Sequence, residues 1–341
     1  MTSKPRRSKI LQFRGLLVIG IILASIVVVG IIRFWVKYGS SGSCIPVDED
    51  VGLSVIETRD GGYLVVGYTQ SIFALLVKVD ANGNIVWNKA LNIMSSILTR
   101  VICGYEGYIA VGWVAENQNA GLCIKVDEEG NIIWNRTYIE QYPIIIRTID
   151  KTINNNYIVV GNIYYDTDTD IWLARIDEDG NVVWSKTIGG PGKDIGNSIV
   201  RASDGYIIAG YTEAGSGDSD LWLLKIDEDG NVVWSKTIGG PGKDIGNSIV
   251  RASDGYIIIG GSSQYPGVWI VKVNENGSVV WNGAIGGPAD VGYSIAQISD
   301  GGYIIVGRSS KYDTGDVLLI KIDKDFHIEW IITYSSFATK G

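Results

Sequence analysis

Histidine is almost missing from this chain, which has one, His327, among 341 residues. That histidine stands in an acidic turn near the carboxyl end, so the sequence offers no Ser-His-Asp or Cys-His set and no histidine-based metal cluster. Cysteine is also scarce: Cys44, Cys103 and Cys123 fit no CxxC metal spacing and are too few for a disulfide framework. The scarcity of both residue types argues against the commonest nucleophilic and zinc-dependent enzymes.

Positive charge is in short supply over most of the chain. The formal net charge is -8, and because residues 1–38 hold seven basic and no acidic residues, the remainder carries -15. A surface of this charge repels the phosphates of nucleic acids. We therefore expect no nucleic-acid partner.

Charge of either sign is absent from the stretch LLVIGIILASIVVVGII, Leu16 to Ile32. With its flanking residues this stretch reaches the roughly 20 apolar residues that cross a bilayer, so we predict a transmembrane helix over 15–37. Basic residues are concentrated before it, so the positive-inside rule places residues 1–14 in the cytoplasm. A cleaved signal peptide is the alternative, but small residues suited to cleavage follow the apolar run only after about ten further residues.

Internal repetition is what the chain has in abundance. The 33 residues Ile176 to Ile208 recur without a difference from Ile226 to Ile258. A weaker form of the same unit covers the region after residue 50, with a Tyr-x-x-x-Gly element and then a turn followed by tryptophan. These tryptophans, spaced by 47, 50, 50, 47 and 49 residues, are Trp87, Trp134, Trp184, Trp234, Trp281 and Trp330. A period near 50 residues indicates six copies of one supersecondary unit.

Each unit is predicted to contain four short antiparallel strands, A to D. In the fifth unit these are 248–253, 256–262, 268–273 and 278–284, with hairpin turns joining A to B and C to D. Strands B and C are nearly continuous apolar runs, which indicates that both faces of the sheet are covered. Blades stacked around an axis meet that condition, so we predict an all-β, six-bladed β-propeller of four-stranded antiparallel blades.

The D-strand pattern DEDGNVVW resembles the Gly-Asn/Lys-x-x-Trp docking motif of quinoprotein-like propellers, and the unit length resembles that of kelch repeats. From Val51 to about Tyr334 the chain is therefore similar to tandem-repeat β-propellers of microbial surface proteins. In such a propeller the six tryptophans are expected to dock one blade on the next. Most copies lack the Gly-Gly doublet of kelch, and the adjacent cysteines of enzymatic quinoproteins are absent, so neither family's activity carries over.

The predicted organisation places a short tether before the propeller. Its segments are a cytoplasmic basic segment (1–14), the transmembrane helix (15–37), a linker (38–50), the propeller (51–334) and a tail (335–341). The linker enters strand A of the first unit, and its last 12 residues, Gly39 to Asp50, span at most roughly 40 Å at about 3.3 Å per residue. The rim on which strand A begins should therefore lie close to the membrane.

The two rims of such a propeller differ in sequence. The A–B and C–D turns lie on one of them, the turn rim, which is short and acidic. The B–C loops and the connections from D to the next A lie on the other, the loop rim, which varies as binding surfaces on rigid scaffolds usually do. Its aromatic candidates, which could stack on a sugar or pack within their own loops, are Tyr164, Tyr165, Tyr265 and Tyr312.

Carboxylates supply two further candidate sets on the loop rim. Asp166, Asp168 and Asp170 alternate within one B–C loop and are candidate oxygen ligands for calcium. A second set occupies equivalent positions between units, where each residue either fixes its own loop by accepting backbone N–H groups or joins a partial ring of carboxylates near the axis. This second set is Asp50, Asp194, Asp244 and Asp290. The units that lack this aspartate would leave an apolar gap where a partner could dock. The gap includes Ile97 and Ile144.

The sequence favours a non-catalytic binding or structural module of the cell envelope. It would be single-pass in the cell membrane, with the amino terminus in the cytoplasm and the propeller outside. Its expected partners are membrane lipid, through the helix, and a membrane-proximal protein or glycan at the loop rim. No cofactor is expected, and calcium is the one metal for which candidate ligands are found. The alternative is a propeller enzyme, either a carboxylate-based glycan hydrolase or lyase or a quinone-dependent oxidoreductase.

Protease digestion of intact cells tests the predicted topology. Because the propeller is expected outside the membrane, an external protease should leave only a short amino-terminal membrane fragment. Immunoblotting with an antibody against residues 1–14 measures the size of that fragment. Full protection of the chain until the cells are lysed would mean that the orientation is reversed.

Overall fold

The computed structural model describes residues 32–34, 50–69, 73–116, 118–213, 218–309 and 316–334. Apart from Ile32–Phe34, the predicted transmembrane segment lies outside these residues, as do residues 1–14, most of the linker and the tail. Ile32–Phe34 form a short strand, β1, rather than part of a helix, because these residues pair antiparallel with β2 (Asp50–Glu57). Among the described residues, no helix is long and apolar enough to span a bilayer.

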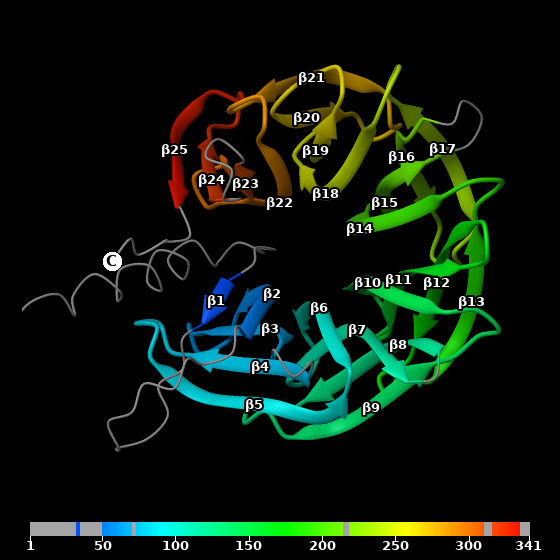
Figure 1. The fold of residues 1–341 in the computed structure, drawn as a ribbon, viewed down its shortest axis with the longest axis vertical. Coiled ribbons are helices and arrows are strands. Elements are labelled where there is room, and N and C mark those ends of the chain that lie inside the picture. Colours follow the sequence, from blue (N-terminus) through cyan, green and yellow to red (C-terminus); the bar gives the residue numbers. More distant parts are fainter. Residues whose placement is uncertain are drawn as a thin grey trace, which may run out of the picture.

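Six antiparallel sheets surround a common axis (Figure 1). Each sheet contains four consecutive strands in the order A to D from the axis outward, and the first also contains β1. The predicted all-β fold, a six-bladed propeller of four-stranded antiparallel blades, is confirmed. The strands of blades 1 to 6 are β2 to β5 (Asp50–Glu57, Tyr63–Tyr68, Phe73–Val79, Ile85–Met94), β6 to β9 (Ser96–Cys103, Tyr108–Glu116, Gln118–Val126, Ile132–Tyr138), β10 to β13 (Ile144–Lys151, Tyr157–Tyr164, Thr169–Ile176, Val182–Ile188), β14 to β17 (Asp194–Ala202, Gly205–Thr212, Asp220–Ile226, Val232–Ile238), β18 to β21 (Asp244–Ala252, Gly255–Ser262, Val268–Val273, Val279–Ile285) and β22 to β25 (Val291–Gln297, Tyr303–Ser309, Asp316–Ile322, Ile328–Tyr334).

Apolar side chains fill the spaces between neighbouring blades. Val160 and Leu173 of blade 3 belong to one buried cluster with Ile208 and Leu224 of blade 4, and none of the four is more than 1% exposed. The first seven residues of β11 are all buried, as the continuous apolar runs of the B strands predict. Because burial of one such side chain contributes about 1.5 to 3 kcal/mol, the faces between blades supply most of the stabilisation.

From blade 1 to blade 5, the outer strand of each blade also contacts the C–D turn of the next blade. Trp134 of β9 donates its indole N–H to the Glu178 carbonyl at 2.9 Å, and its ring lies against Gly180, which has a φ of +76°. Corresponding pairs of tryptophan and glycine are Trp87 with Gly130, Trp184 with Gly230 and Trp234 with Gly277. At the junction of blades 5 and 6, Phe326 occupies the position that is glycine in the other turns, and it stacks on Trp281 with ring centroids 4.8 Å apart.

The ring closes through packing of blade 6 against blade 1. In the described part of the chain every blade is built from its own four consecutive strands, so no strand of one blade completes the other. Val65 and Val77 of blade 1 share a buried cluster with Ile304 and Val306 of blade 6, and Trp330 packs against that cluster. Among the residues that the structure describes, closure therefore depends on side-chain burial.

A bulge interrupts each innermost strand at the same place. In β14 the pairing with β15 slips by one residue between Gly196 and Ser198, and the other five A strands slip at equivalent positions. The residue at the bulge is Asn197 in blade 4, and its side-chain amide donates to the Gly246 carbonyl of blade 5 at 2.9 Å. Thr99 and Asn247 bond the next A strand in the same way, so three of the six bulge residues connect neighbouring A strands beside the axis. The full set is Leu53, Thr99, Arg147, Asn197, Asn247 and Tyr293.

Alanine substitutions at two glycines measure the contribution of the docking contact. Gly230 and Gly61 have nearly equal φ values, +74° and +76°, but a Cβ on Gly230 would lie 2.4 Å from Trp184 whereas a Cβ on Gly61 would meet nothing within 4 Å. Gly61→Ala should lower the free energy of unfolding by about 1 to 2 kcal/mol, the cost of the left-handed backbone. Gly230→Ala should cost about 1 to 3 kcal/mol more, because the added methyl displaces the indole. Urea unfolding measures both, and equal losses would contradict the docking role.

Candidate functional site

The C–D turns of the turn rim share one hydrogen-bonding arrangement. In blade 3, Asp177 Oδ1 accepts the backbone N–H groups of Asp179 (3.0 Å) and Asn181 (2.8 Å), and Oδ2 accepts the Asn181 side-chain amide (3.0 Å). The equivalent acceptors in the other blades are Asp80, Asp127, Asp227, Asn274 and Asp323. In blade 1, hydrogen bonds from the side chain and backbone of Asn84 lower the pKa of Asp80. These acceptors are committed to their own turns.

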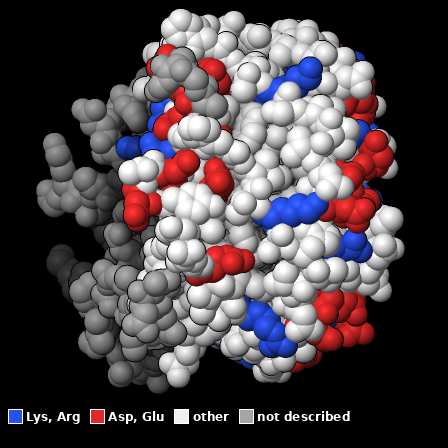
Figure 2. All heavy atoms as spheres, turned by 90° about the vertical axis from the view of Figure 1, so that its right-hand side faces the viewer, with Lys and Arg blue, Asp and Glu red and all other residues white. Residues whose placement is uncertain are grey.

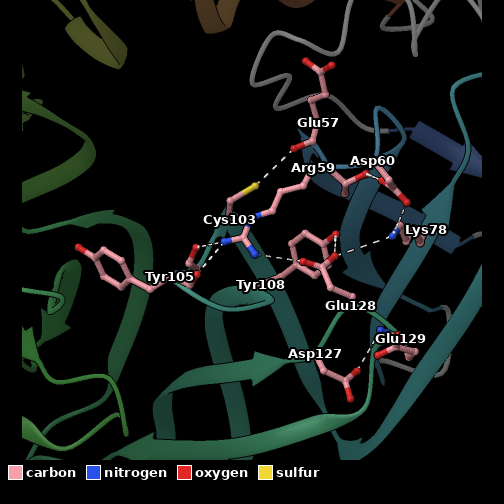
Figure 3. Close-up of polar contacts among 12 residues, drawn as sticks. Glu57, Arg59, Asp60, Lys78, Cys103, Tyr105, Tyr108, Asp127, Glu128 and Glu129 are labelled. Carbon is pink, nitrogen blue, oxygen red and sulfur yellow. Dashed lines mark hydrogen bonds and ion pairs between the residues drawn. The ribbon is translucent and has the colours of Figure 1, made fainter.

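Polar side chains of the turn rim also link blade 1 to blade 2 (Figure 3). Arg59 Nη2 donates to the backbone oxygens of Gly104 at 3.0 Å and Tyr105 at 2.8 Å. The same guanidinium lies 3.4 Å from the Glu128 carboxylate, which also accepts the hydroxyl of Tyr108. Both ion-pair partners are more than a third exposed, so the pair itself adds little stability. The hydrogen bonds of Arg59 instead hold the A–B turns of blades 1 and 2 in register.

A lysine on strand C pairs with an aspartate of the A–B turn in several blades. Lys78 Nζ lies 2.8 Å from Asp60, and hydrogen bonds from Lys78 and then Thr58 lower the pKa of Asp60 to about 2. Only the lysine is buried, so it can extend its apolar stem along the sheet while its ammonium group reaches the turn. The equivalent pairs are Lys225 with Asp204, Lys272 with Asp254 and Lys321 with Asp300.

On the loop rim, the equivalent aspartates between blades bind their own connections. Asp194 Oδ2 accepts the backbone N–H of Gly190 at 2.6 Å, and Asp244 Oδ2 accepts that of Gly240 at 2.9 Å. Asp290 accepts the N–H of Gly287 at 2.6 Å in the same manner. All three carboxylates are buried. Asp50 begins β2, but its side chain lies outside the description.

Two of these aspartates also face a second carboxylate from the preceding blade. A Cβ placed on Gly189 would lie 1.9 Å from Asp170 Oδ1 and 2.9 Å from Asp194 Oδ2. A Cβ placed on Gly239 would lie 2.1 Å from Asp220 Oδ1 and 2.8 Å from Asp244 Oδ2. The structure thus places Asp170 beside Asp194 and repeats the pair one blade later. Asp220 was not among the residues expected from the sequence. The matching tripeptides DIW and DLW, which end in the C-strand tryptophans, would have indicated that Asp220 is equivalent to Asp170.

The three aspartates proposed from the sequence as calcium ligands have different surroundings. Asp166 is exposed, and Asp168 Oδ1 accepts the neighbouring Thr169 N–H at 2.7 Å. Asp170 faces Asp194, and its pKa is raised by burial and then by the charges of Asp168 and Asp194. Within the described ranges, no three or more acidic, histidine or cysteine side chains form a group that could hold a metal ion.

The described candidate tyrosines divide between blades 3 and 5. Tyr164 accepts a hydrogen bond from Arg147 at 3.2 Å, and Tyr165 packs edge-on against Tyr142 with centroids 4.8 Å apart. Both belong to blade 3, whereas Tyr265 belongs to blade 5, where it stacks on Trp269 at 6.3 Å and is 36% exposed. Tyr312 lies outside the described residues. The structure therefore does not bring Tyr164 and Tyr265 into one aromatic site.

The apolar gap expected on the loop rim is filled in part. Ile144 is fully buried in the core between blades 2 and 3, so it is not available to a partner, and this expectation was wrong for that residue. Ile144 fits there because Gly121 of blade 2 has no side chain, and a Cβ at that glycine would lie 3.3 Å from Ile144. Ile97 is half-buried on the neighbouring A strand.

The scarce residues take structural positions. Cys123 is fully buried, and Cys103 is half-buried with its thiol 3.4 Å from the Glu57 carbonyl (Figure 3). Burial raises the pKa of Cys103, which disfavours the reactive thiolate. His327 is exposed in the last C–D turn, where its ring nitrogen lies 3.0 Å from Asp323.

Charge is distributed unevenly around the outside of the ring. Seen from the side of the outer strands, acidic side chains gather toward both rims, and a mostly uncharged band with a few basic side chains lies between them (Figure 2). The outer strands of blades 3 and 4 contribute exposed valines to this perimeter, namely Val182, Val183, Val232 and Val233. A partner that approaches either rim would therefore meet acidic side chains, whereas one that approaches the outer strands would meet a mostly uncharged surface.

Comparisons with known proteins bear on the fold and the family. The sequence profile of the family described as "Outer membrane protein assembly factor BamB" matches residues 119–301, more than half of the chain. A search of curated proteins finds no match. Among solved structures, two mutants of Synechocystis apocarotenoid oxygenase have TM-scores of 0.50 at 10% and 11% identity, each over 80% of this chain and 69% of theirs. At such low identity the likeness concerns the fold alone.

Acid titration tests the ion pairs of the turn rim. The pKa of Asp60 is about 2 in the folded chain, against an ordinary value of 3.8. A lowered carboxyl pKa stabilises the fold above the unfolded value, and that contribution is lost as the pH falls through the folded value. The difference in unfolding free energy between the wild type and Asp60→Asn should thus be largest above pH 4 and disappear toward pH 2. Asp254→Asn should behave alike because Lys272 lowers the pKa of Asp254. A difference independent of pH would contradict the pairing.

Proposed function

This chain belongs to the PQQ-like (BamB-type) repeat family of β-propellers, and on that basis we propose that it is a non-catalytic binding or structural module of the cell envelope. The family is described as an assembly factor for outer membrane proteins, and that description favours a protein partner for this member. The proposed binding surface is the loop rim.

The observation that carries this proposal is the difference between the rims. On the turn rim the polar groups repeat from blade to blade and bind their own turns, as Asp177 and Asp227 do. On the loop rim the connections repeat an aspartate, but the B–C loops differ, with Tyr164 on Arg147 in blade 3 and Tyr265 on Trp269 in blade 5. A rim whose side chains stabilise the fold varies little in sequence, whereas a rim that binds a partner usually varies.

The location of the module follows from the sequence of the amino-terminal segment. We propose that the apolar residues ahead of β1, within the predicted segment 15–37, anchor the chain in the cell membrane, with residues 1–14 in the cytoplasm and the propeller outside. Membrane lipid is then one partner. The short linker keeps the start of strand A near the bilayer, which favours a membrane-proximal protein or glycan as the second.

Enzymatic alternatives find less support in the geometry. Asp170 and Asp194 are close enough to resemble the carboxylate pair of a retaining glycosidase, about 5 to 5.5 Å apart. However, Asp170 Oδ1 is inaccessible, so a glycosidic bond could not approach it. The carboxylates of a quinone cofactor would need cationic side chains to pair with. Among the six bulge residues beside the axis, only Arg147 is cationic, and it already donates to Tyr164. The residues there do not fit such a cofactor.

Site-specific photo-crosslinking on cells tests the binding surface. A photoreactive amino acid should be placed at Tyr164 or Tyr265 on the loop rim and, as matched controls, at Glu129 or Asp229 on exposed turns. We expect discrete adducts from the loop-rim positions and none from the turn positions. Adducts confined to the turn positions, or absent at all four, would reject the assignment.

A further inference from the structure

Two equivalent carboxylate pairs at successive blade junctions have no role in the function proposed above. One joins Asp170 to Asp194 across blades 3 and 4, and the other joins Asp220 to Asp244 across blades 4 and 5. In each, the first aspartate begins or adjoins strand C and the second begins the next strand A. The pairs lie on the loop rim, so they are separate from the docking contacts of the tryptophans.

Backbone contacts hold the two members of each pair together. Thr169, beside Asp170, forms an isolated parallel bridge with Lys193, beside Asp194. At the next junction the N–H of Asp244 donates to the Ser219 carbonyl at 2.6 Å. Because both oxygens of a pair lie within 3 Å of one point beside the intervening glycine, they are less than about 5 Å apart, a separation that one calcium ion with Ca–O distances of about 2.3 to 2.6 Å can bridge.

Asp194 Oδ2 and Asp244 Oδ2 each accept one backbone N–H, but each pair also contains a carboxylate oxygen that the protein does not satisfy. Among the described residues, Asp170 Oδ1, Asp220 Oδ1 and Asp244 Oδ1 are buried and have no hydrogen-bond partner. Asp244 is only 1% exposed, so water does not readily replace the missing partner. An unpaired buried carboxylate oxygen beside a second carboxylate is costly unless a cation compensates both charges.

The surrounding charges do not supply that cation. Burial is the main cause of the raised pKa of Asp220, followed by the charges of Asp244 and Asp218. For Asp170 the corresponding charges are Asp168 and Asp194. The nearest lysine in sequence, Lys193, pairs with Glu213 at 3.1 Å. Each site therefore gathers negative charge around two inward oxygens.

We propose that each pair binds one divalent cation of the calcium type, so that the chain holds two equivalent ions across successive blade junctions. Calcium prefers carboxylate and carbonyl oxygens, and water can complete its coordination shell from the side of the half-buried residues Asp170 and Asp220. The two carboxylates come from different blades, and the ion would therefore strengthen the junctions from the loop rim, opposite the tryptophan docking contacts.

Blade 5 lacks the pair and supplies an internal control. The C-strand tryptophans Trp172, Trp222 and Trp269 are equivalent, and the residues two positions before them are Asp170, Asp220 and Gly267. Asp290, at the junction of blades 5 and 6, therefore has no carboxylate partner of this kind. It still accepts the Gly287 N–H, so it shares the loop-fixing role without the proposed ion.

Calorimetric titration of the purified full-length chain with Ca²⁺ tests the proposal. We expect two ions per wild-type chain, one for Asp170→Asn, one for Asp220→Asn and none for the double variant, because asparagine keeps the shape but removes a charge. Asp290→Asn should still bind two. In thermal unfolding, Ca²⁺ should raise the Tm of the wild type and not that of the double variant.

Several outcomes would overturn the proposal. Absence of binding at millimolar Ca²⁺ would do so, and so would a stoichiometry unchanged in the double variant. If instead the wild type binds no ion and gains stability as the pH falls toward the raised pKa values of Asp170 and Asp220, the pairs share protons rather than a cation. The titration uses no partner, so its failure leaves the binding role of the loop rim to be judged separately.

Discussion

The ring depends on one contact repeated from blade to blade, the packing of an outer-strand tryptophan on the C–D turn of the next blade. The turn can receive an indole because a glycine with positive φ leaves no Cβ in the way, as at Gly180 and Gly230. The exception supports the same reasoning, since Phe326 occupies the glycine position with a φ of +67° and meets Trp281 by stacking. Apolar burial between blades stabilises the ring, but this contact sets the register of one blade on the next.

This contact explains why a long segment can be copied without change. The segment Ile176 to Ile208 carries both the glycine that receives the preceding tryptophan and the tryptophan that docks on the following turn. A copy therefore adds a blade whose two flanking contacts already fit. The turn rim is constrained by this role, and variation is left to the loop rim, where blades 3 and 5 present unlike loops.

Much of the fold could be predicted from local pattern. Strand C of the fifth unit was expected at 268–273 and is β20, Val268–Val273, because a continuous apolar run bounded by turns is a strong strand signal. Strand A was expected from 248 but begins at Asp244, since pairing continues past a bulge that breaks the periodicity. The pairing of Asp170 with Asp194 was not foreseeable, because it depends on the distance between two blades. Periodicity also could not show that Ile144 packs against Gly121 of blade 2.

The central claim is that the turn rim is committed to holding the ring together while the loop rim is free to bind. Amide hydrogen exchange of the full-length protein, followed by mass spectrometry, tests it most directly. Peptides covering 127–131, 177–181 and 227–231 should exchange slowly, because their turn amides are hydrogen-bonded and lie under docked indoles. Peptides covering the loops at 164–168 and 263–267 should exchange faster, because their hydrogen-bonded amides lie in largely exposed loops that no docked indole covers. The reverse order, with protected loops and open turns, would contradict the account.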